Sequence, residues 1–182
     1  MNSEFEGHPE TDRALQRYLG SDKYRYRTKK GADGSTRHLI AKKHYGEFWL
    51  EETLKDDEPE SLGPEEVATF IVYWLSLKRA MTRSMVMVIA PLMVSFILLL
   101  IVNADISPDF QNLYFGILTV FAYVAGFVAV FKTEHSVDAH VYAACPNFIS
   151  VLQKIKDSKK DKYEKKEIEN RIKRLQAIDC SS

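Results

Sequence analysis

Residues 85–102 read MVMVIAPLMVSFILLLIV, and residues 110–131 read FQNLYFGILTVFAYVAGFVAVF. Neither stretch contains a charged residue, and each is close to the roughly 20 residues that a helix needs to cross a bilayer. The connection from Asn103 to Gln111 is too short to form a domain. These observations predict two transmembrane helices, at about 84–104 and 111–131, which are joined as a hairpin.

Basic residues flank the predicted spans on one side only. Lys78, Arg79 and Arg83 precede the first span and Lys132 follows the second, whereas the connection carries no Lys or Arg. Cations near the ends of spans favour the cytoplasmic side of a membrane. We therefore expect these four topology-setting residues to place both termini in the cytoplasm and the chain in the inner (plasma) membrane, as a multi-pass protein. A hairpin buried inside a soluble protein is the alternative.

The whole chain is less informative than its parts. Its 182 residues carry 25 Lys and Arg against 25 Asp and Glu, and two cysteines are too few for a disulfide-stapled scaffold. We expect a mainly α, integral membrane fold in three parts. A cytoplasmic α+β subdomain with an acidic linker spans 1–61, a helical stalk with the transmembrane hairpin spans 62–146, and a basic cytoplasmic helical tail spans 147–182.

Short elements are expected in the N-terminal subdomain. Residues 9–19 form a predicted helix, with Pro9 suited to its first position and Gly20 to its end. Residues 23–43 alternate aromatic or small residues with basic ones around a Gly-rich turn, which predicts a β-hairpin. Residues 45–54 are interpreted as a further short helix.

The predicted hairpin is strongly basic. Such a segment could contact lipid head groups or a nucleic acid, with Tyr24 and Tyr26 available for stacking. The alternative is a solvated strand face, with both tyrosines in a small core. The candidate residues for contact with lipid or a polyanion are Arg25, Arg27, Lys29, Lys30, Arg37, Lys42 and Lys43.

Small side chains recur along one face of the second apolar run. Thr119, Ala122, Gly126 and Ala129 are spaced by three, four and three residues, so two helices can approach closely there. The stripe is a candidate seam between copies in a homo-oligomer. Packing against the first apolar helix of the same chain is the other interpretation.

Motifs for enzymatic chemistry are missing from the sequence. It contains no glycine-rich phosphate loop, no nucleophile elbow and no two-histidine zinc motif. His135 and Asp138 share a helical face, but a solvated polar face is the favoured interpretation over a metal site. We therefore expect a protein that is not an enzyme, with no cofactor and no metal.

In layout, residues 65–144 resemble the small two-transmembrane, SLATT-like effectors of bacterial antiviral defence. The resemblance lies in a helix that enters the first span, a short outer connection and a helix that leaves the second. It implies a non-enzymatic membrane effector that oligomerises on a cytoplasmic signal and perturbs the membrane. The implied partners are the lipid bilayer, further copies of the chain and a signalling protein or ligand. The alternative is a membrane-anchored adaptor or accessory subunit that binds a cytoplasmic protein or nucleic acid.

Overall fold

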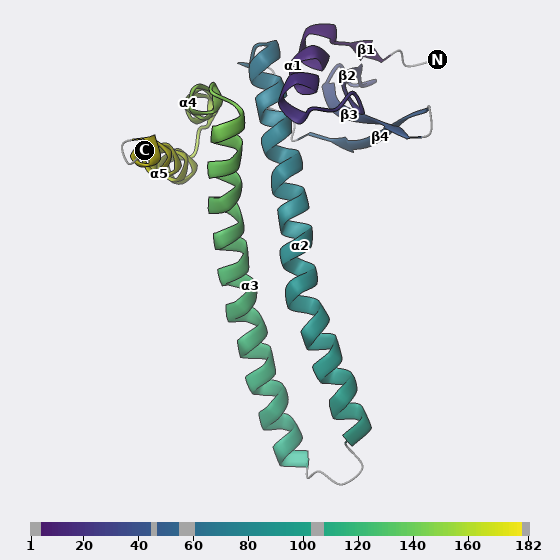
Figure 1. The fold of residues 1–182 in the computed structure, drawn as a ribbon, viewed down its shortest axis with the longest axis vertical. Helices are drawn as coiled ribbons and strands as arrows, with labels where there is room; N and C mark the ends of the chain where they lie inside the picture. Colours follow the sequence, from purple (N-terminus) through teal and green to yellow (C-terminus); the bar gives the residue numbers. More distant parts are fainter. Residues whose placement is uncertain (1–4, 45–46, 55–60, 103–107, 180–182) are drawn as a thin grey trace. The chain divides into compact units, whose positions relative to one another are not determined.

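The computed structural model describes residues 5–44, 47–54, 61–102 and 108–179. Within these ranges, the side chains of residues 44–52 and of part of residues 90–131 lie outside the description. The described chain is mostly helical, with one small antiparallel sheet (Figure 1). Its elements are β1 (Glu6–Gly7), α1 (Pro9–Leu19), β2 (Tyr24–Lys30), β3 (Thr36–His44), β4 (Glu47–Thr53), α2 (Pro64–Val102), α3 (Pro108–Ala144), α4 (Phe148–Ser158) and α5 (Lys162–Asp179).

The chain divides into two compact units. Unit 1 comprises Met1–Trp74 and Asp138–Ser182, and unit 2 comprises Leu75–Val137. Helices α2 and α3 each contribute residues to both units.

The sheet in unit 1 has the strand order β1-β2-β3-β4, and every neighbouring pair is antiparallel. Tyr26 lies opposite Ile40, and both side chains are buried. The β2–β3 turn ends at Gly34, whose φ of 82° is a left-handed conformation that glycine adopts without steric cost. Asp12 of α1 accepts the backbone N–H of Tyr26 at 2.8 Å, so α1 covers an edge of β2 that the two-residue β1 leaves unpaired.

The helix expected at residues 9–19 and the hairpin expected at 23–43 are both present as α1 and β2–β3. The short helix expected at residues 45–54 is wrong, because Glu47–Thr53 forms strand β4. This strand pairs with β3 through a register shift between Ile40 and Ala41. Aromatic residues suit a strand as well as a helix face. A short isolated helix is only marginally stable because its nucleation is costly, whereas this segment can add to an existing sheet by pairing with β3.

Helices α2 to α5 complete unit 1 around an apolar core. Gly63 N–H donates to Glu66 Oε2 at 2.9 Å, which closes the first turn of α2 as half of a capping box. On α5, Ile168, Ile172 and Leu175 are buried at the four-then-three spacing that predicts an amphipathic helix. The remaining buried side chains of these helices include Val67, Phe70, Ile71, Val72, Val141, Phe148, Val151, Leu152 and Ile155.

Unit 2 contains the lower stretches of α2 and α3 in Figure 1, which are antiparallel and meet through a hydrogen bond between Ser84 Oγ and Thr133 Oγ1 at 2.5 Å. Among the described residues, neither helix offers a stretch that is both long and apolar enough to cross a membrane.

This finding contradicts the predicted integral membrane fold, with spans at about 84–104 and 111–131. The corrected fold is mostly helical with a small sheet, and it includes no transmembrane hairpin among the described residues. The prediction of a multi-pass inner-membrane protein with both termini in the cytoplasm is overturned by the same finding. The topology-setting role predicted for Lys78, Arg79, Arg83 and Lys132 depended on those spans, so it loses its basis with them.

Candidate functional site

The basic residues of the hairpin do not form one uniform surface. Arg25 and Arg27 both reach Asp12, with Arg25 Nε at 3.6 Å and Arg27 Nη1 at 3.0 Å from Oδ2 of the carboxylate. The side chains of Arg25, Arg27 and Asp12 are mostly buried, with exposed fractions of 22%, 26% and 15%. Asp12 therefore neutralises part of the positive charge that we predicted would contact an anionic partner.

The other hairpin cations differ in their surroundings. The Lys29 ammonium lies 5.3 Å from the centre of the Phe5 ring, within the range of a cation–π contact. Lys42 is half-buried, whereas Lys30, Arg37 and Lys43 are exposed. These three exposed cations are the part of the predicted contact surface that an anionic partner can reach.

The hairpin tyrosines belong to the core of unit 1. Tyr24 and Tyr26 are 7% and 4% exposed, and the Tyr26 hydroxyl bonds to His38 Nδ1 at 2.5 Å. Base stacking needs an exposed ring face, so neither tyrosine offers a platform for a nucleic acid in this conformation.

A cavity of about 680 Å³ lies in unit 1 beside the first turn of α2. Two ion pairs border it: Arg17 Nη1 with Glu65 Oε1 at 3.1 Å, and Lys154 Nζ with Glu66 Oε2 at 2.6 Å. Three acidic and three basic side chains line the cavity, so it has no strong preference for a ligand of either charge. Its lining consists of Glu10, Arg13, Ala14, Arg17, Gly63, Pro64, Glu65, Glu66, Asn147 and Lys154.

Glu66 is the most constrained carboxylate of this lining. Partial burial acts to raise its pKa, but hydrogen bonds from Lys154 Nζ and from Gly63 N–H outweigh burial and lower the pKa below its ordinary value. Glu66 is therefore held as a carboxylate that joins α4 to the start of α2.

A small polar cluster adjoins the cavity through Asn147, which belongs to its lining. The Thr69 hydroxyl, which is fully buried, donates to Asn147 Oδ1 at 2.6 Å. Cys145 is also fully buried, and burial raises the pKa of its thiol to about 11. Because the thiolate is the reactive form, Cys145 has the properties of a structural residue.

Asp138 and Arg171 form a largely buried ion pair, with side chains 3% and 18% exposed. Arg171 donates through Nη2 to Asp138 Oδ1 at 2.6 Å and through Nε to Oδ2 at 3.0 Å. The guanidinium carbon also lies 4.9 Å from the centre of the Tyr73 ring. Sequence reasoning placed Asp138 on a solvated face and missed Arg171, because residues 33 positions apart show no local pattern.

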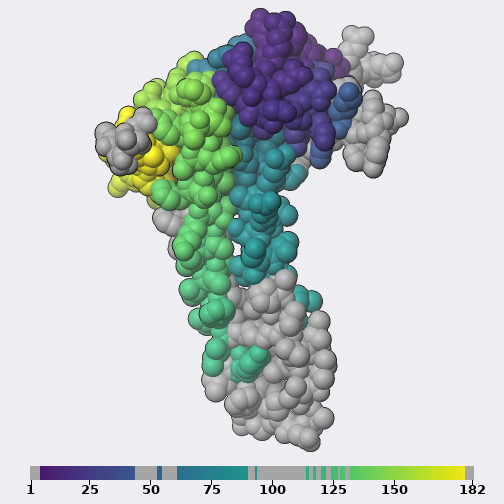
Figure 2. Space-filling view, in the orientation of Figure 1, coloured from purple at the N-terminus to yellow at the C-terminus, as the bar shows by residue number. Residues whose placement is uncertain are grey.

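Both helices of unit 2 expose large apolar side chains among the described residues. In α2 the exposed large apolar residues are Met85, Val86, Met87, Ile89 and Met93, and in α3 they are Ile117, Val120, Phe121, Val124 and Val128. Their exposures run from 46% at Val128 to 78% at Met87. On the face shown in Figure 2, the described side chains of both helices reach the surface of unit 2.

The predicted small-residue seam is only partly described. The side chains of Thr119 and Ala122 lie outside the description, whereas Gly126 and Ala129 are half-buried. Among the described atoms, none lies within 4 Å of a β-carbon built at Gly126. Whether the seam joins two copies therefore stays a prediction.

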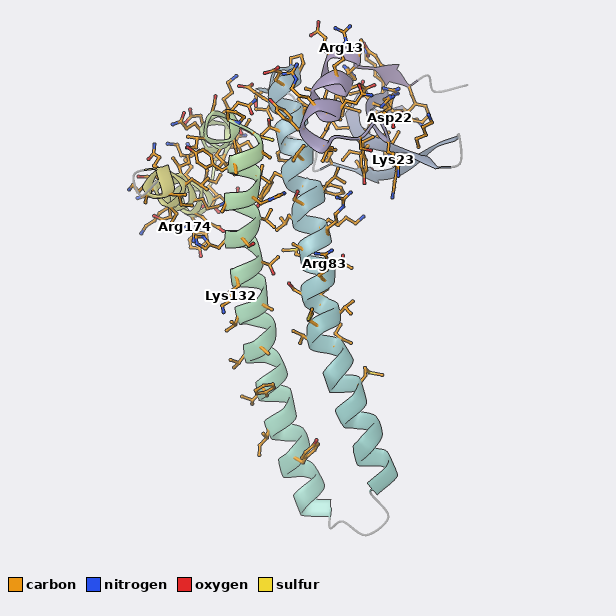
Figure 3. The ribbon with its side chains drawn as sticks, in the orientation of Figure 1. Arg13, Asp22, Lys23, Arg83, Lys132 and Arg174 are labelled. Atoms are coloured by element: carbon orange, nitrogen blue, oxygen red, sulfur yellow. The ribbon has the colours of Figure 1, made fainter. Side chains whose placement is uncertain are left out.

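The four flanking cations all belong to unit 2. Lys78, Arg79, Arg83 and Lys132 are all exposed, and Figure 3 shows Lys132 on the side of α3 that faces away from α2. Arg83 and Lys132 are the direct neighbours of the bonded pair Ser84 and Thr133.

No cluster of metal-ligating side chains occurs among the described residues. Asp138, which the sequence analysis considered with His135 as a metal site, is instead bonded to Arg171. Comparisons with models of protein families, with curated proteins and with solved structures found no match to this chain.

Proposed function

We propose that this chain is a non-enzymatic, self-associating protein in which unit 1 receives a signal and unit 2 joins copies of the chain. The proposal is carried by one observation: both helices of unit 2 expose rows of large apolar side chains. Monomeric proteins rarely expose contiguous apolar patches larger than a few hundred Å², and larger ones mark interaction surfaces.

The contrast between the units supports this division of roles. Unit 1 has a buried apolar core, with Leu15, Ile40, Ile71 and Phe148 at most 1% exposed, and its exposed large apolar residues Phe5, Tyr163 and Ile178 lie far apart in the sequence. In unit 2, Phe121 is 71% exposed and Met87 is 78% exposed. Unit 1 can therefore fold around its own core, whereas unit 2 gains stability by covering its side chains with a partner.

The cavity beside the first turn of α2 is the proposed entry point for the signal. Its walls come from α1, α2 and α4, so a small polar ligand bound there would contact three elements at once. A ligand shifts assembly only if it binds the assembled and free chains with different affinity. The α2 helix supports such a link because it is continuous from the cavity into unit 2.

Self-association is the part of the expected effector function that is proposed here. The predicted membrane perturbation depended on the two spans, which the described helices contradict. The resemblance to antiviral effectors stays a prediction from the sequence and supplies none of the support.

The experiment is to measure the molar mass of the full chain by sedimentation velocity over a hundredfold range of concentration. Self-association predicts a mass that rises with concentration above the 20.9 kDa of one chain. A single species of 20.9 kDa at every concentration would contradict the proposal.

A second candidate function is binding of an anionic partner by unit 1. The observation that favours it is the exposure of Lys30, Arg37 and Lys43 on β2 and β3. Phosphate contacts of this kind position a partner without reading its sequence. Replacing the three by Ser should then abolish retention on an immobilised polyanion, and unchanged retention would exclude this surface.

A further inference from the structure

We infer that α2 and α3 of unit 2 present two different outer faces, and that the α2 face of one copy binds the α3 face of the next. The inference rests on the proposed function, since it says how the self-association is built. It differs from the seam of small residues, which it assigns to contact within one chain.

The inner side of the hairpin is marked by the hydrogen bond between Ser84 and Thr133. Thr133 lies seven residues after Gly126, which in turn lies seven after Thr119, so the small-residue stripe continues into the bonded threonine. A repeat of seven residues keeps to one side of a helix that packs beside another. The described members of the stripe, Gly126 and Ala129, therefore lie on the side of α3 that carries Thr133.

Exposure agrees with this assignment. On α2, the half-buried residues Leu77, Met81, Ser84 and Val88 recur at spacings of three and four. On α3, Ala129 and Thr133 are half-buried too. These residues on the Ser84 and Thr133 side are thus less exposed than the outer ones, whereas Met87, 78% exposed, lies at the edge of this side, about 60° around the helix from Ser84.

The outer face of α2 consists of Met85, Val86, Ile89 and Met93. At 3.6 residues per turn, these side chains are centred about 150° around the helix from Ser84. Two of the four are methionines, whose flexible thioether side chains adapt to an opposing surface.

The outer face of α3 consists of Ile117, Val120, Phe121, Val124 and Val128. These side chains are centred about 160° around the helix from Thr133. The two outer faces therefore point away from each other, and they cannot cover one another within the hairpin.

The two faces match in level along the helices. Because α2 and α3 are antiparallel and Ser84 meets Thr133, Ile89 is level with Val128, and Met93 is level with Val124. Two copies placed side by side in the same orientation thus bring these pairs together without sliding along the helix axis. A second copy fits the α2 face for this reason.

The area available suits a protein interface. From their exposed fractions, one α2 face and one α3 face together offer on the order of 1,000 Å², close to the smallest area expected of a specific interface. A contact between two different faces is heterologous, so each copy can bind two neighbours. Such contacts close into a ring or continue as a filament.

The test uses two full-length variants that each lose one face. Ile89→Glu/Met93→Glu disables the α2 face, and Val124→Glu/Val128→Glu disables the α3 face. A matched variant, Gly126→Ser, changes the inner side. Molar masses of each variant and of an equimolar mixture of the two face variants are measured by light scattering, with circular dichroism as the check that each chain is folded.

The inference predicts that each face variant alone is monomeric, that their mixture forms a one-to-one dimer and nothing larger, and that Gly126→Ser assembles like the parent chain. Dimers of the α3-face variant alone would show pairing of like α2 faces, and dimers of the α2-face variant would show pairing of like α3 faces. Either result, or full assembly of both variants, overturns the inference while leaving self-association standing. A monomeric parent chain that instead co-sediments with phosphatidylcholine vesicles would assign the faces to lipid and overturn both proposals.

Discussion

The guanidinium of Arg171 on α5 donates two hydrogen bonds to the carboxylate of Asp138 on α3, which is 2% exposed. Burial acts against the charge of Arg171, but the bonds to Asp138 outweigh it and raise the pKa of the guanidinium. The pair thus fixes α5 to the end of α3 inside unit 1.

Removing one partner of this pair should be strongly destabilising. Asp138→Ala leaves the buried Arg171 without its carboxylate and should cost about 3–5 kcal/mol of unfolding free energy. Urea unfolding monitored by circular dichroism measures the change. The control is Lys173→Ala on α5, which breaks the exposed pair with Glu169 and should leave the urea midpoint unchanged. Equal midpoints for Asp138→Ala and the control would refute the role of the pair.

Replacing both partners together should be much milder than replacing one. The double variant Asp138→Leu/Arg171→Met keeps the volume and removes both charges, so it should unfold within about 2 kcal/mol of the parent chain. A loss equal to the sum of the single replacements would mean that the two residues act independently.

The contribution of Glu66 should depend on pH. Its lowered pKa means that the folded state favours the carboxylate, so its stabilising effect is present above the ordinary value of 4.5 and is lost as the pH falls through the lowered value. Glu66→Gln should therefore cost about 1 kcal/mol at pH 7 and less at pH 3. Urea midpoints of both chains at the two pH values test this, and an equal cost at both would disprove the linkage.

The thiol of Cys145 should be protected in the folded protein. Burial raises its pKa to about 11, so at pH 8 it is protonated as well as inaccessible. In a Cys180→Ser background, a thiol reagent should modify the chain at least a hundredfold more slowly in buffer than in 6 M guanidinium. Equal rates would contradict the burial.

The stability that this thiol contributes should be complete below pH 9 and lost as the pH rises toward 11. The sign follows from the raised pKa, because the folded state holds the thiol proton more tightly than the unfolded chain does. A Cys145→Ala variant should lack this component of the alkaline decline. Identical alkaline profiles for the two chains would exclude it.

Freeing the hairpin arginines should strengthen binding to polyanions. Asp12→Asn removes the carboxylate that both Arg25 and Arg27 reach, so two more cations become available at the surface of unit 1. The variant should elute from immobilised heparin at a higher salt concentration than the parent chain. Elution at the same salt concentration would show that the two arginines do not take part.

Local patterns in the sequence were sufficient for most helices. Pro9 and Gly20 bound α1, and the Gly63–Pro64–Glu65–Glu66 start of α2 has a proline at the first position and acids in the first turn. The spacing of Ile168, Ile172 and Leu175 likewise placed a buried face on α5. These signals lie within a few residues of one another, so one sequence is enough to read them.

Contacts between distant residues were not predictable in this way. Strand β4 depends on pairing with β3, and nothing in residues 45–54 alone distinguishes a strand from a short amphipathic helix. The Asp138–Arg171 pair and the Ser84–Thr133 bond join residues far apart in the chain. The small-residue stripe could be identified from its spacing. Which helix lies beside it could not, because that depends on the bond between Thr133 and the distant Ser84.

Disulfide cross-linking between copies tests the central claim most directly. In a Cys180→Ser background, chains carrying Ile89→Cys are mixed with chains carrying Val128→Cys and oxidised, with Gly126→Cys in place of Val128→Cys as the inner control. The level match predicts a covalent dimer of two chains, about 42 kDa, from the Ile89 and Val128 variants and little from the control. Cross-linking through the Gly126 variant instead, or no covalent dimer from any mixture, would contradict self-association through the outer faces of unit 2.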